Sequence, residues 1–251
     1  MNLVLVDKSQ CGADDSIALD DRQARHLLEV LKVKPGSEVS VGIVNGPIGR
    51  ARVSHCNASD CAVALEWLPA SLADSSPPKL PLRLLIALPR PKVARRLVQT
   101  CAELGIAELH FINSYRVEKS YWQSPLLEPA TIEQATRLGL EQCRDSQIMR
   151  VEFHSRFKPF IEDVFPALVG EDRCLLAHPK VLDNVTTICE PPHCRQQTLT
   201  VVVGPEGGFI DYEVERLLEA GCEHWQLGKR IYRVETVVPL IVGQLAAGLR
   251  E

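Results

Sequence analysis

Two short segments carry residue types that could bind an anionic ligand or stabilise a developing negative charge. The first, Gly204–Phe209, reads GPEGGF and follows an apolar run. Glycines at a strand-to-helix turn let the backbone approach a ligand closely, and the N–H groups of such a turn favour an anion or carboxylate. The second segment reads LGKRIYRVET and places Arg230 three residues before Arg233. These arginines could hold an anion or only form a salt-bridged helix start, and the glycine turn could be purely structural.

Neither segment matches the common nucleotide-binding loops. The spacing G-x-x-G-G differs from the dinucleotide-binding pattern G-x-G-x-x-G, and the Lys-Ser/Thr pair of a P-loop is absent. The chain has 251 residues and a net charge of −4. This balance argues against a protein that coats RNA nonspecifically, since such proteins usually carry a large positive excess. Two local basic clusters fit a directed phosphate contact or a solvated helix face: Arg83, Arg90, Lys92, Arg95 and Arg96, and Lys229, Arg230 and Arg233.

Composition narrows the class of protein further. Hydrophobic residues make up 45% and charged residues 24%, which is ordinary for a globular chain. No uncharged apolar stretch reaches eighteen residues, and the first residues lack the pattern of a secretory signal, so a cytoplasmic protein is expected. The nine cysteines are then expected to be free and mostly buried. A zinc site could form only if two C-x4-C pairs met in space: Cys56/Cys61, and Cys189/Cys194 with His193. Their spacing is looser than that of structural zinc sites. No metal site is therefore predicted.

The chain divides at a Pro/Ser-rich stretch. Residues 69–81 read PASLADSSPPKLP and predict a linker between a domain of residues 1–68 and a domain of residues 82–251. In the first domain, a helix capped by Asp20 or Asp21 is predicted to run through Leu31, and Asn45-Gly46 indicates a hairpin turn. A small antiparallel barrel follows, with strands Glu38–Val44, Ile48–His55 and Cys61–Trp67.

Strands and helices alternate after the linker, which predicts a mostly parallel sheet covered by helices. The apolar run Leu82–Leu88 is typical of a strand buried on both faces. The last helix is apolar nearly all round and must be buried inside the domain or in a dimer contact. The expected strands are Leu82–Leu88, Glu108–Ile112, Met149–Phe153, Cys174–Ala177, Leu199–Val203 and Glu223–Leu227, and the expected helices are Lys92–Leu104, Thr131–Cys143, Phe160–Leu168, Tyr212–Ala220 and Val234–Leu249.

The pairing of GPEGGF with LGKRIYRVET closely resembles the RsmE-type 16S ribosomal RNA uridine N3-methyltransferases of the SPOUT superfamily. The segments CAELG, ending at Gly105, and Ser114–Val117 are also similar. The resemblance implies an α/β fold with a parallel sheet and a C-terminal trefoil knot, preceded by a PUA-like barrel that helps to dock RNA. It also implies S-adenosylmethionine as methyl donor, a homodimer, and the small ribosomal subunit as partner.

The resemblance assigns roles to individual residues. Arg233 would stabilise the uridine anion, Glu206 would orient a ligand group or accept a proton, and Arg230 would contact phosphate or base. S-adenosylmethionine would lie between the loops Leu176–Pro179, Gly204–Gly208 and Leu227–Val234, with Leu176, His178, Gly204, Glu206, Gly208, Leu227, Gly228, Ile231, Tyr232 and Val234 as its binding residues. RNA contacts are expected from Arg22, Arg25, Arg90, Arg116 and Arg230.

Several positions depart from the family's pattern. Thr100 stands where a lysine is usual, Asp145 displaces an arginine, and Ile210 replaces a capping serine, a role that Asp211 is predicted to take over. The target could therefore differ from the family's. The alternatives are a SPOUT enzyme that methylates a ribose 2′-hydroxyl or a tRNA base, an RNA-binding assembly protein without catalysis, and an unrelated anion-binding α/β enzyme.

Overall fold

The computed structural model describes residues 2–57, 59–68, 76–180, 186–188 and 198–249. Within these ranges the chain forms two compact units, each with its own sheet. The first comprises residues 1–78 together with residues 136–148, and the second comprises residues 79–135 and 149–251. The possible zinc ligands Cys189, His193 and Cys194 lie outside the described residues. No described helix has the length and apolar character needed to cross a membrane.

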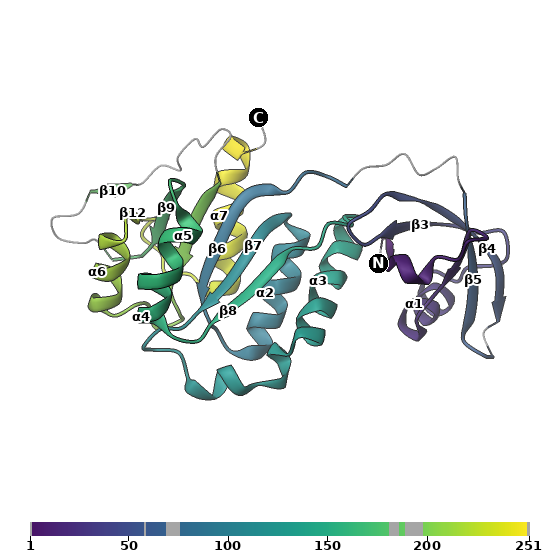
Figure 1. The fold of residues 1–251 in the computed structure, drawn as a ribbon, viewed down its shortest axis with the longest axis horizontal. Helices are drawn as coiled ribbons and strands as arrows, with labels where there is room; N and C mark the ends of the chain where they lie inside the picture. The colour runs from purple at the N-terminus through teal and green to yellow at the C-terminus, as the bar shows by residue number, and fades with distance from the viewer. Residues whose placement is uncertain (1, 58, 69–75, 181–185, 189–197, 250–251) are drawn as a thin grey trace. The chain divides into compact units, whose positions relative to one another are not determined.

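The first unit is built on a curled five-stranded sheet (Figure 1). The strand order is β1-β3-β4-β5-β2, with β1 parallel to β3 and the other pairs antiparallel. The predicted hairpin is present, and Asn45 takes the positive φ of 54° that such turns favour. The strands are β1 (Val4–Val6), β2 (Ser16–Ala18), β3 (Glu38–Ile43), β4 (Ile48–Asn57) and β5 (Ala62–Trp67).

A short helix packs against this sheet. Helix α1 (Asp21–Arg25) begins at Asp20, whose carboxylate accepts the backbone N–H of Gln23 at 2.7 Å. The backbone N–H of Asp20 in turn donates to the side-chain oxygen of Gln23, which completes a capping box. The helix continues as a single π-helical stretch, η2 (His26–Val30), rather than as the regular helix through Leu31 that the sequence predicts.

The end of a later helix also belongs to the first unit. Helix α3 (Pro129–Cys143) begins in the second unit, but its residues from Thr136 onward have their contacts with the first. The backbone carbonyl of Glu141 accepts the N–H groups of Asn2 and Leu3 at 2.9 and 3.0 Å. These bonds fasten the start of β1 to the helix. A contribution from so distant a segment is not visible in local sequence patterns.

The second unit is a seven-stranded sheet in which every described pair of neighbours is parallel, as predicted. The strand order is β10-β12-β9-β11-β6-β7-β8. Strand β6 lies between β11 and β7, and its residues from Leu84 to Ala87 are fully buried. The strands are β6 (Leu80–Ala87), β7 (Ile106–Ile112), β8 (Arg150–His154), β9 (Arg173–Ala177), β10 (Thr187–Ile188), β11 (Leu199–Val203) and β12 (Glu223–Trp225).

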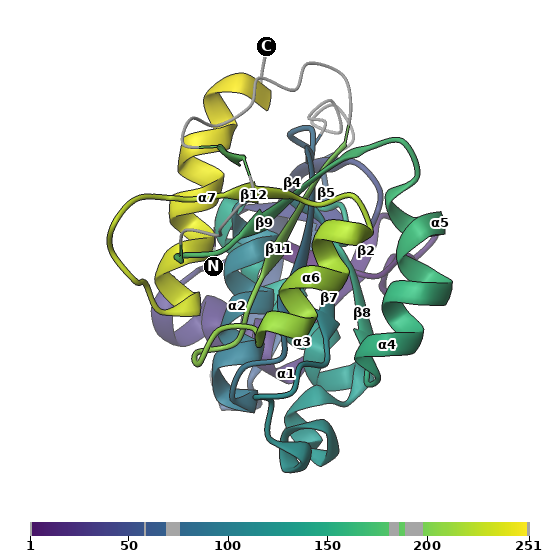
Figure 2. The same cartoon turned by 90° about the vertical axis from the view of Figure 1, so that its left-hand side faces the viewer.

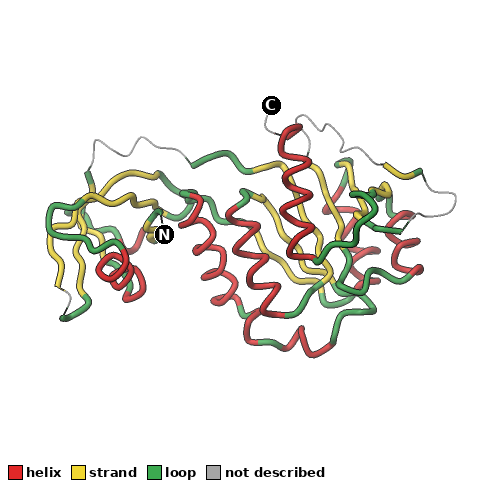
Figure 3. The backbone as a smooth tube through the Cα atoms, turned by 180° about the vertical axis from the view of Figure 1, so that it is seen from behind, coloured by secondary structure: helices red, strands yellow, loops and turns green. Residues whose placement is uncertain are grey.

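Helices cover both faces of this sheet (Figure 2). Helices α2 (Pro91–Glu103) and α7 (Val234–Leu249) lie on one face, and α5 (Phe165–Val169) and α6 (Asp211–Glu219) lie on the other (Figure 3). The remaining helical turns are η4 (Lys119–Gln123), η5 (Pro125–Leu127), α4 (Phe157–Pro159) and η6 (Phe160–Val164). The predicted helix Phe160–Leu168 is therefore a π-helical stretch followed by α5.

Candidate functional site

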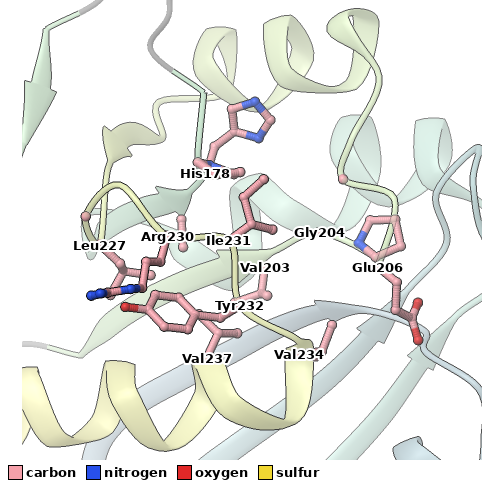
Figure 4. Close-up of a pocket in the computed structure, with 15 residues that line it drawn as sticks. His178, Val203, Gly204, Glu206, Leu227, Arg230, Ile231, Tyr232, Val234 and Val237 are labelled. Atoms are coloured by element: carbon pink, nitrogen blue, oxygen red, sulfur yellow. The ribbon is translucent and has the colours of Figure 1, made fainter.

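A cavity opens at the carboxyl ends of β9, β11 and β12 (Figure 4). In parallel α/β sheets this edge is where ligands bind, because the loops that leave the strands converge there. The cavity opens to solvent and has mostly apolar walls with a few polar groups, which suits a small-molecule ligand. Its lining residues are Ala177, His178, Pro179, Val203, Gly204, Pro205, Glu206, Gly208, Leu227, Gly228, Arg230, Ile231, Tyr232, Val234 and Val237.

The glycine-rich segment forms one wall as a tight turn. The N–H of Gly208 donates to the carbonyl of Pro205 at 2.7 Å, and Gly208 has a φ of +73°. Residues with a side chain rarely adopt this conformation. Gly204 packs against the ring of Phe209, since a Cβ atom at Gly204 would lie 3.1 Å from Cδ2 of that ring. The sequence of this loop is thus required by its backbone shape.

The second wall is the segment between β12 and α7. Gly228 has a φ of +123°, a conformation that is essentially restricted to glycine. At the other end of the segment, the carbonyl of Arg233 accepts the N–H groups of Thr236 and Val237, both at 2.9 Å, and so begins α7. The chain between these points is mostly exposed, and the side chain of Ile231 is 82% exposed.

His178 closes the cavity from the end of β9. Its backbone N–H donates to the carbonyl of Trp225 at 3.1 Å, and its own carbonyl lies 3.1 Å from Nε2 of His224. Burial lowers the pKa of His178, and the neighbouring His224 lowers it further. The imidazole is therefore neutral at pH 7 and adds no positive charge to the cavity.

The structure gathers most of the predicted cofactor residues around this one space. Of that set, Leu176 alone does not line the cavity, since it is fully buried in β9. Val203 and Val237 line the cavity but lie outside the three predicted loops. Val237 stands one helical turn after Val234 on the same face of α7, so helical spacing would have indicated it.

The two predicted catalytic residues differ in position. Glu206 lines the cavity and is exposed, and its carboxylate points away from Arg230 and Tyr232 (Figure 4). Arg233 is exposed and lies between the lining residues Tyr232 and Val234, but it does not itself line the cavity. An exposed guanidinium beside the cavity is available to a substrate that approaches from solvent.

The predicted RNA-contacting arginines are divided between the two units. Arg22 and Arg25 lie in the first unit, where Arg22 pairs with Glu141 and Arg25 is exposed. Arg90 is exposed at the N-cap of α2, directly after β6. Arg116 donates from Nη1 to the carbonyls of Gly207 and Gly208, so part of its guanidinium already binds the glycine-rich turn.

The departures from the family's pattern have local structural roles. Ile210 is the N-cap of α6, and its N–H donates to Glu213 at 3.0 Å, so the prediction that Asp211 caps this helix is wrong. Asp145 is 1% exposed and accepts the N–H of Gln147 at 2.8 Å. Arg144, at a φ of +62°, reaches Ser40 at 3.4 Å. Asp145 therefore shapes the turn that follows α3.

Three potential metal ligands meet at β7 and β8. One donor atom each from His110, Glu152 and His154 lies within 4.8 Å of the others. Nδ1 of His110 is 3.1 Å from Nε2 of His154, as in a hydrogen bond between the rings, and Nε2 of His110 is 3.2 Å from Glu108. Glu108 in turn accepts from Nε of Arg83 at 2.9 Å. This hydrogen-bonded chain accounts for the cluster, and we assign no metal to it.

The described cysteines are free thiols. Cys101, Cys174 and Cys222 are buried, but Cys11, Cys56, Cys61 and Cys143 are half-buried, so the expectation that most cysteines are buried is wrong for the described residues. Burial raises the pKa of Cys101 to about 12, so this thiol is not a nucleophile at neutral pH.

Comparison with known proteins identifies similar chains. The family model described as the RNA methyltransferase domain matches residues 76–246. The "Ribosomal RNA small subunit methyltransferase E" of Treponema pallidum is 28% identical over 242 residues, covering 94% of this chain and 87% of its own. The "Ribosomal RNA small subunit methyltransferase E 1" of Borreliella burgdorferi is 24% identical over 238 residues, covering 94% and 93%.

Among solved structures, the Neisseria gonorrhoeae "Ribosomal RNA small subunit methyltransferase E" bound to S-adenosyl methionine superposes with a TM-score of 0.71. It is 20% identical and covers 98% of this chain and 96% of its own. At this identity the likeness shows that the fold is shared along nearly the whole chain.

Proposed function

Because the chain belongs to the RNA methyltransferase domain family, we propose that it methylates N3 of a uridine in 16S ribosomal RNA with S-adenosylmethionine as methyl donor. The resemblance predicted from GPEGGF and LGKRIYRVET is confirmed at the level of the family, since relatives along nearly the whole chain are small-subunit methyltransferases E. The observation that carries the proposal is the convergence of both motifs on one cavity at the carboxyl edge of the sheet.

The cavity fits the proposed methyl donor. S-adenosylmethionine combines an apolar adenine ring with a carboxylate and an ammonium group, and needs apolar walls beside exposed backbone groups. Apolar contact is available from Leu227, Val203 and Val237, and the tight turn at Gly208 exposes backbone around it. The related Neisseria enzyme was crystallised with this cofactor, which supports the same donor here. When bound, S-adenosylmethionine supplies an electrophilic methyl group.

The chemistry at uridine N3 sets what the protein must do. N3 carries a proton that must leave before its lone pair can form the new N–C bond, and the base then bears negative charge. We assign stabilisation of that charge to Arg233, whose exposed guanidinium flanks the cavity at the N-cap of α7. Arg230, which lines the cavity, would hold a phosphate or the base, and Glu206 would orient a ligand group or accept the proton. Much of the rate would come from holding N3 close to the methyl group.

The finer features of the family are proposed with this activity. We propose that residues 1–68 form a PUA-like module that docks RNA, that residues 69–81 are a linker, and that residues 82–251 are a SPOUT domain with a trefoil knot. The apolar helix α7 would contribute to the homodimer through exposed positions such as Pro239 and Gly243, since Val238 and Ile241 are already fully buried within the chain. The substrate would be the small ribosomal subunit or its RNA, in the cytoplasm. Arg22, Arg25, Arg90, Arg116 and Arg230 are the proposed RNA contacts.

A methyl-transfer assay on small subunits tests this proposal. Subunits from a strain that lacks the protein would be incubated with the enzyme and S-adenosylmethionine, and the digested RNA analysed by nucleoside mass spectrometry. New 3-methyluridine is expected. If a methylated ribose or another methylated base formed instead, S-adenosylmethionine would still be the methyl donor, but the methylated atom would not be uridine N3. If no product forms although S-adenosylmethionine raises the thermal midpoint, the protein is not a methyltransferase of this RNA, and a non-catalytic assembly protein becomes the better account.

A further inference from the structure

The segment that follows β7 presents an aromatic ring to solvent. Tyr115 is 80% exposed, whereas its neighbours Ser114 and Val117 are 3% and 7% exposed. The N–H of Val117 donates to the carbonyl of Ser114 at 3.0 Å, so Tyr115 occupies the first central position of a tight turn. Exposing a large aromatic side chain at the tip of a well-anchored turn gives no packing energy. A single exposed aromatic side chain is ordinary on a protein surface, but the backbone that carries this one is held in place on both sides.

A buried carboxylate fixes the turn from one side. Glu213, which is 2% exposed, accepts the hydroxyl of Ser114 at 3.0 Å and the N–H of Tyr115 at 2.7 Å. The same carboxylate accepts the N–H of Ile210 at 3.0 Å. Ile210 directly follows the GPEGGF turn, so one side chain connects the backbone of Tyr115 to the glycine-rich wall of the cavity. A buried charge with three donors has little freedom to move.

Arg116 fixes the turn from the other side. Its guanidinium donates to the carbonyls of Gly207 and Gly208. A Cβ atom at Gly207 would lie 3.0 Å from Cδ of Arg116, so the absence of a side chain at Gly207 leaves room for the arginine. Arg116 is therefore a positioning residue for its neighbour. The ring of Tyr115 remains free, while the backbone on both sides of it is held to a wall that includes the cavity-lining Glu206 and Gly208.

We propose that Tyr115 is a stacking platform for a nucleobase of the RNA substrate, beside the entrance of the cofactor cavity; this inference rests on the proposed function. Proteins recognise single-stranded RNA by stacking unpaired bases on exposed aromatic rings. A ring carried on this anchored backbone would keep a base of the substrate close to the methyl donor. Arg90, exposed after β6 on the same edge of the sheet, would suit a phosphate of the same RNA.

Three variants test the stacking role by steady-state methylation of 16S ribosomal RNA. Tyr115→Leu removes the π face, Tyr115→Phe retains it, and Tyr212→Leu is the control, because Tyr212 is a 47% exposed tyrosine on α6 that does not line the cavity. Base stacking contributes about 1–3 kcal/mol, so Tyr115→Leu should raise KM for RNA about 5- to 150-fold. The kcat at saturating RNA and the Kd for S-adenosylmethionine should stay near wild type, and the other two variants should resemble wild type throughout.

Photo-crosslinking gives a readout that does not depend on catalysis. Transcribed 16S ribosomal RNA containing 5-iodouridine would be irradiated with the protein bound to S-adenosylhomocysteine, and the cross-linked peptide identified by mass spectrometry. A cross-link at Tyr115, lost in Tyr115→Leu, is expected. If wild-type protein shows this cross-link but transfers no methyl group, the proposed function fails and the stacking role stands. A wild-type KM in Tyr115→Leu, or cross-links only elsewhere, overturns the stacking role.

Discussion

Arg22 and Glu141 form a bidentate ion pair within the first unit, in which Nη1 and Nη2 of the arginine each lie 2.8 Å from one carboxylate oxygen. The two side chains are unequally covered: that of Glu141 is 2% exposed and that of Arg22 is 35% exposed. The pair raises the pKa of Arg22 and joins α1 to the last turns of α3, 119 residues further along the chain. Arg22 thus has a structural partner besides any contact it makes with RNA.

This asymmetry predicts unequal effects of removing either partner. Arg22→Met leaves a buried carboxylate without its cation and should lower the free energy of unfolding by about 3 kcal/mol. Glu141→Gln leaves a partly exposed arginine that water can solvate, so it should lower the free energy of unfolding by roughly half as much as Arg22→Met. Urea denaturation at pH 7 measures both, with Arg25→Ala, an exposed neighbour, as a control expected within about 0.5 kcal/mol of wild type. Equal losses in the two variants would contradict the burial argument.

Arg233→Ala should abolish most methyl transfer without weakening binding of the methyl donor. Removing a group that stabilises charge only in the transition state typically lowers the rate about 100- to 1000-fold. Single-turnover transfer to 16S ribosomal RNA measures the rate, and titration calorimetry measures the Kd for S-adenosylmethionine, which should stay within about twofold because Arg233 does not line the cavity. Lys229→Ala serves as a charge-matched control from the same loop. Near-normal transfer by Arg233→Ala would remove this residue from the mechanism.

Gly228→Ala should weaken binding of S-adenosylmethionine. A φ of +123° strains any residue with a side chain by about 1–3 kcal/mol, so the loop would relax and change the cavity wall. The readout is the shift in thermal midpoint caused by S-adenosylmethionine, which should shrink or vanish. Gly221→Ala is the matched control, because Gly221 also has a positive φ, +97°, but does not line the cavity. That variant should lose stability while keeping the ligand-induced shift, and an identical loss of the shift in both would refute the assignment.

Stability should fall as the pH drops below about 6.5. Burial lowers the pKa of His110 and His154 from the ordinary value of 6.5, and for His154 the neighbouring His110 adds to the effect. Above pH 6.5 both imidazoles are neutral in the folded and in the unfolded chain, so the free energy of unfolding has its full value. Below it the unfolded chain takes up protons that the native pair resists, so native stability declines until the lowered pKa values are passed.

Urea midpoints measured from pH 8 to pH 5 test this dependence. His154→Asn should flatten the decline, since one of the two resisting imidazoles is gone, although His26 and His178, whose pKa values are also lowered, keep part of it. A midpoint that is unchanged between pH 7 and pH 5 in the wild-type protein would contradict the prediction.

The elements that sequence patterns predicted well are those with strong local signals. The continuous apolar run of β6 indicated a strand buried on both faces. The two loops were marked by their glycines, and the positive φ values of Gly208 and Gly228 favour glycine there. Strands β1 and β10 were not predicted, since runs of three and two residues carry too little periodicity. The capping of α6 was assigned to Asp211 by adjacency, whereas Glu213 provides it from inside the helix.

Long-range partners lay outside what local patterns can reveal. Arg116 was predicted as an RNA contact, and the structure shows that its guanidinium also donates to carbonyls 91 and 92 residues away. Tyr115 is anchored through its backbone N–H by Glu213, which lies 98 residues further along the chain.

Helix α3 limits where the chain can be divided into fragments that each contain a whole unit. Its first half belongs to one unit and its second half to the other, so the N-terminal module is assembled from two stretches of chain separated by more than fifty residues. A fragment that ends near residue 78 would lack the helical turn that bonds Asn2, Leu3 and Arg22 in the first unit. Neither part of the chain, expressed alone, would then contain all the residues of the first unit.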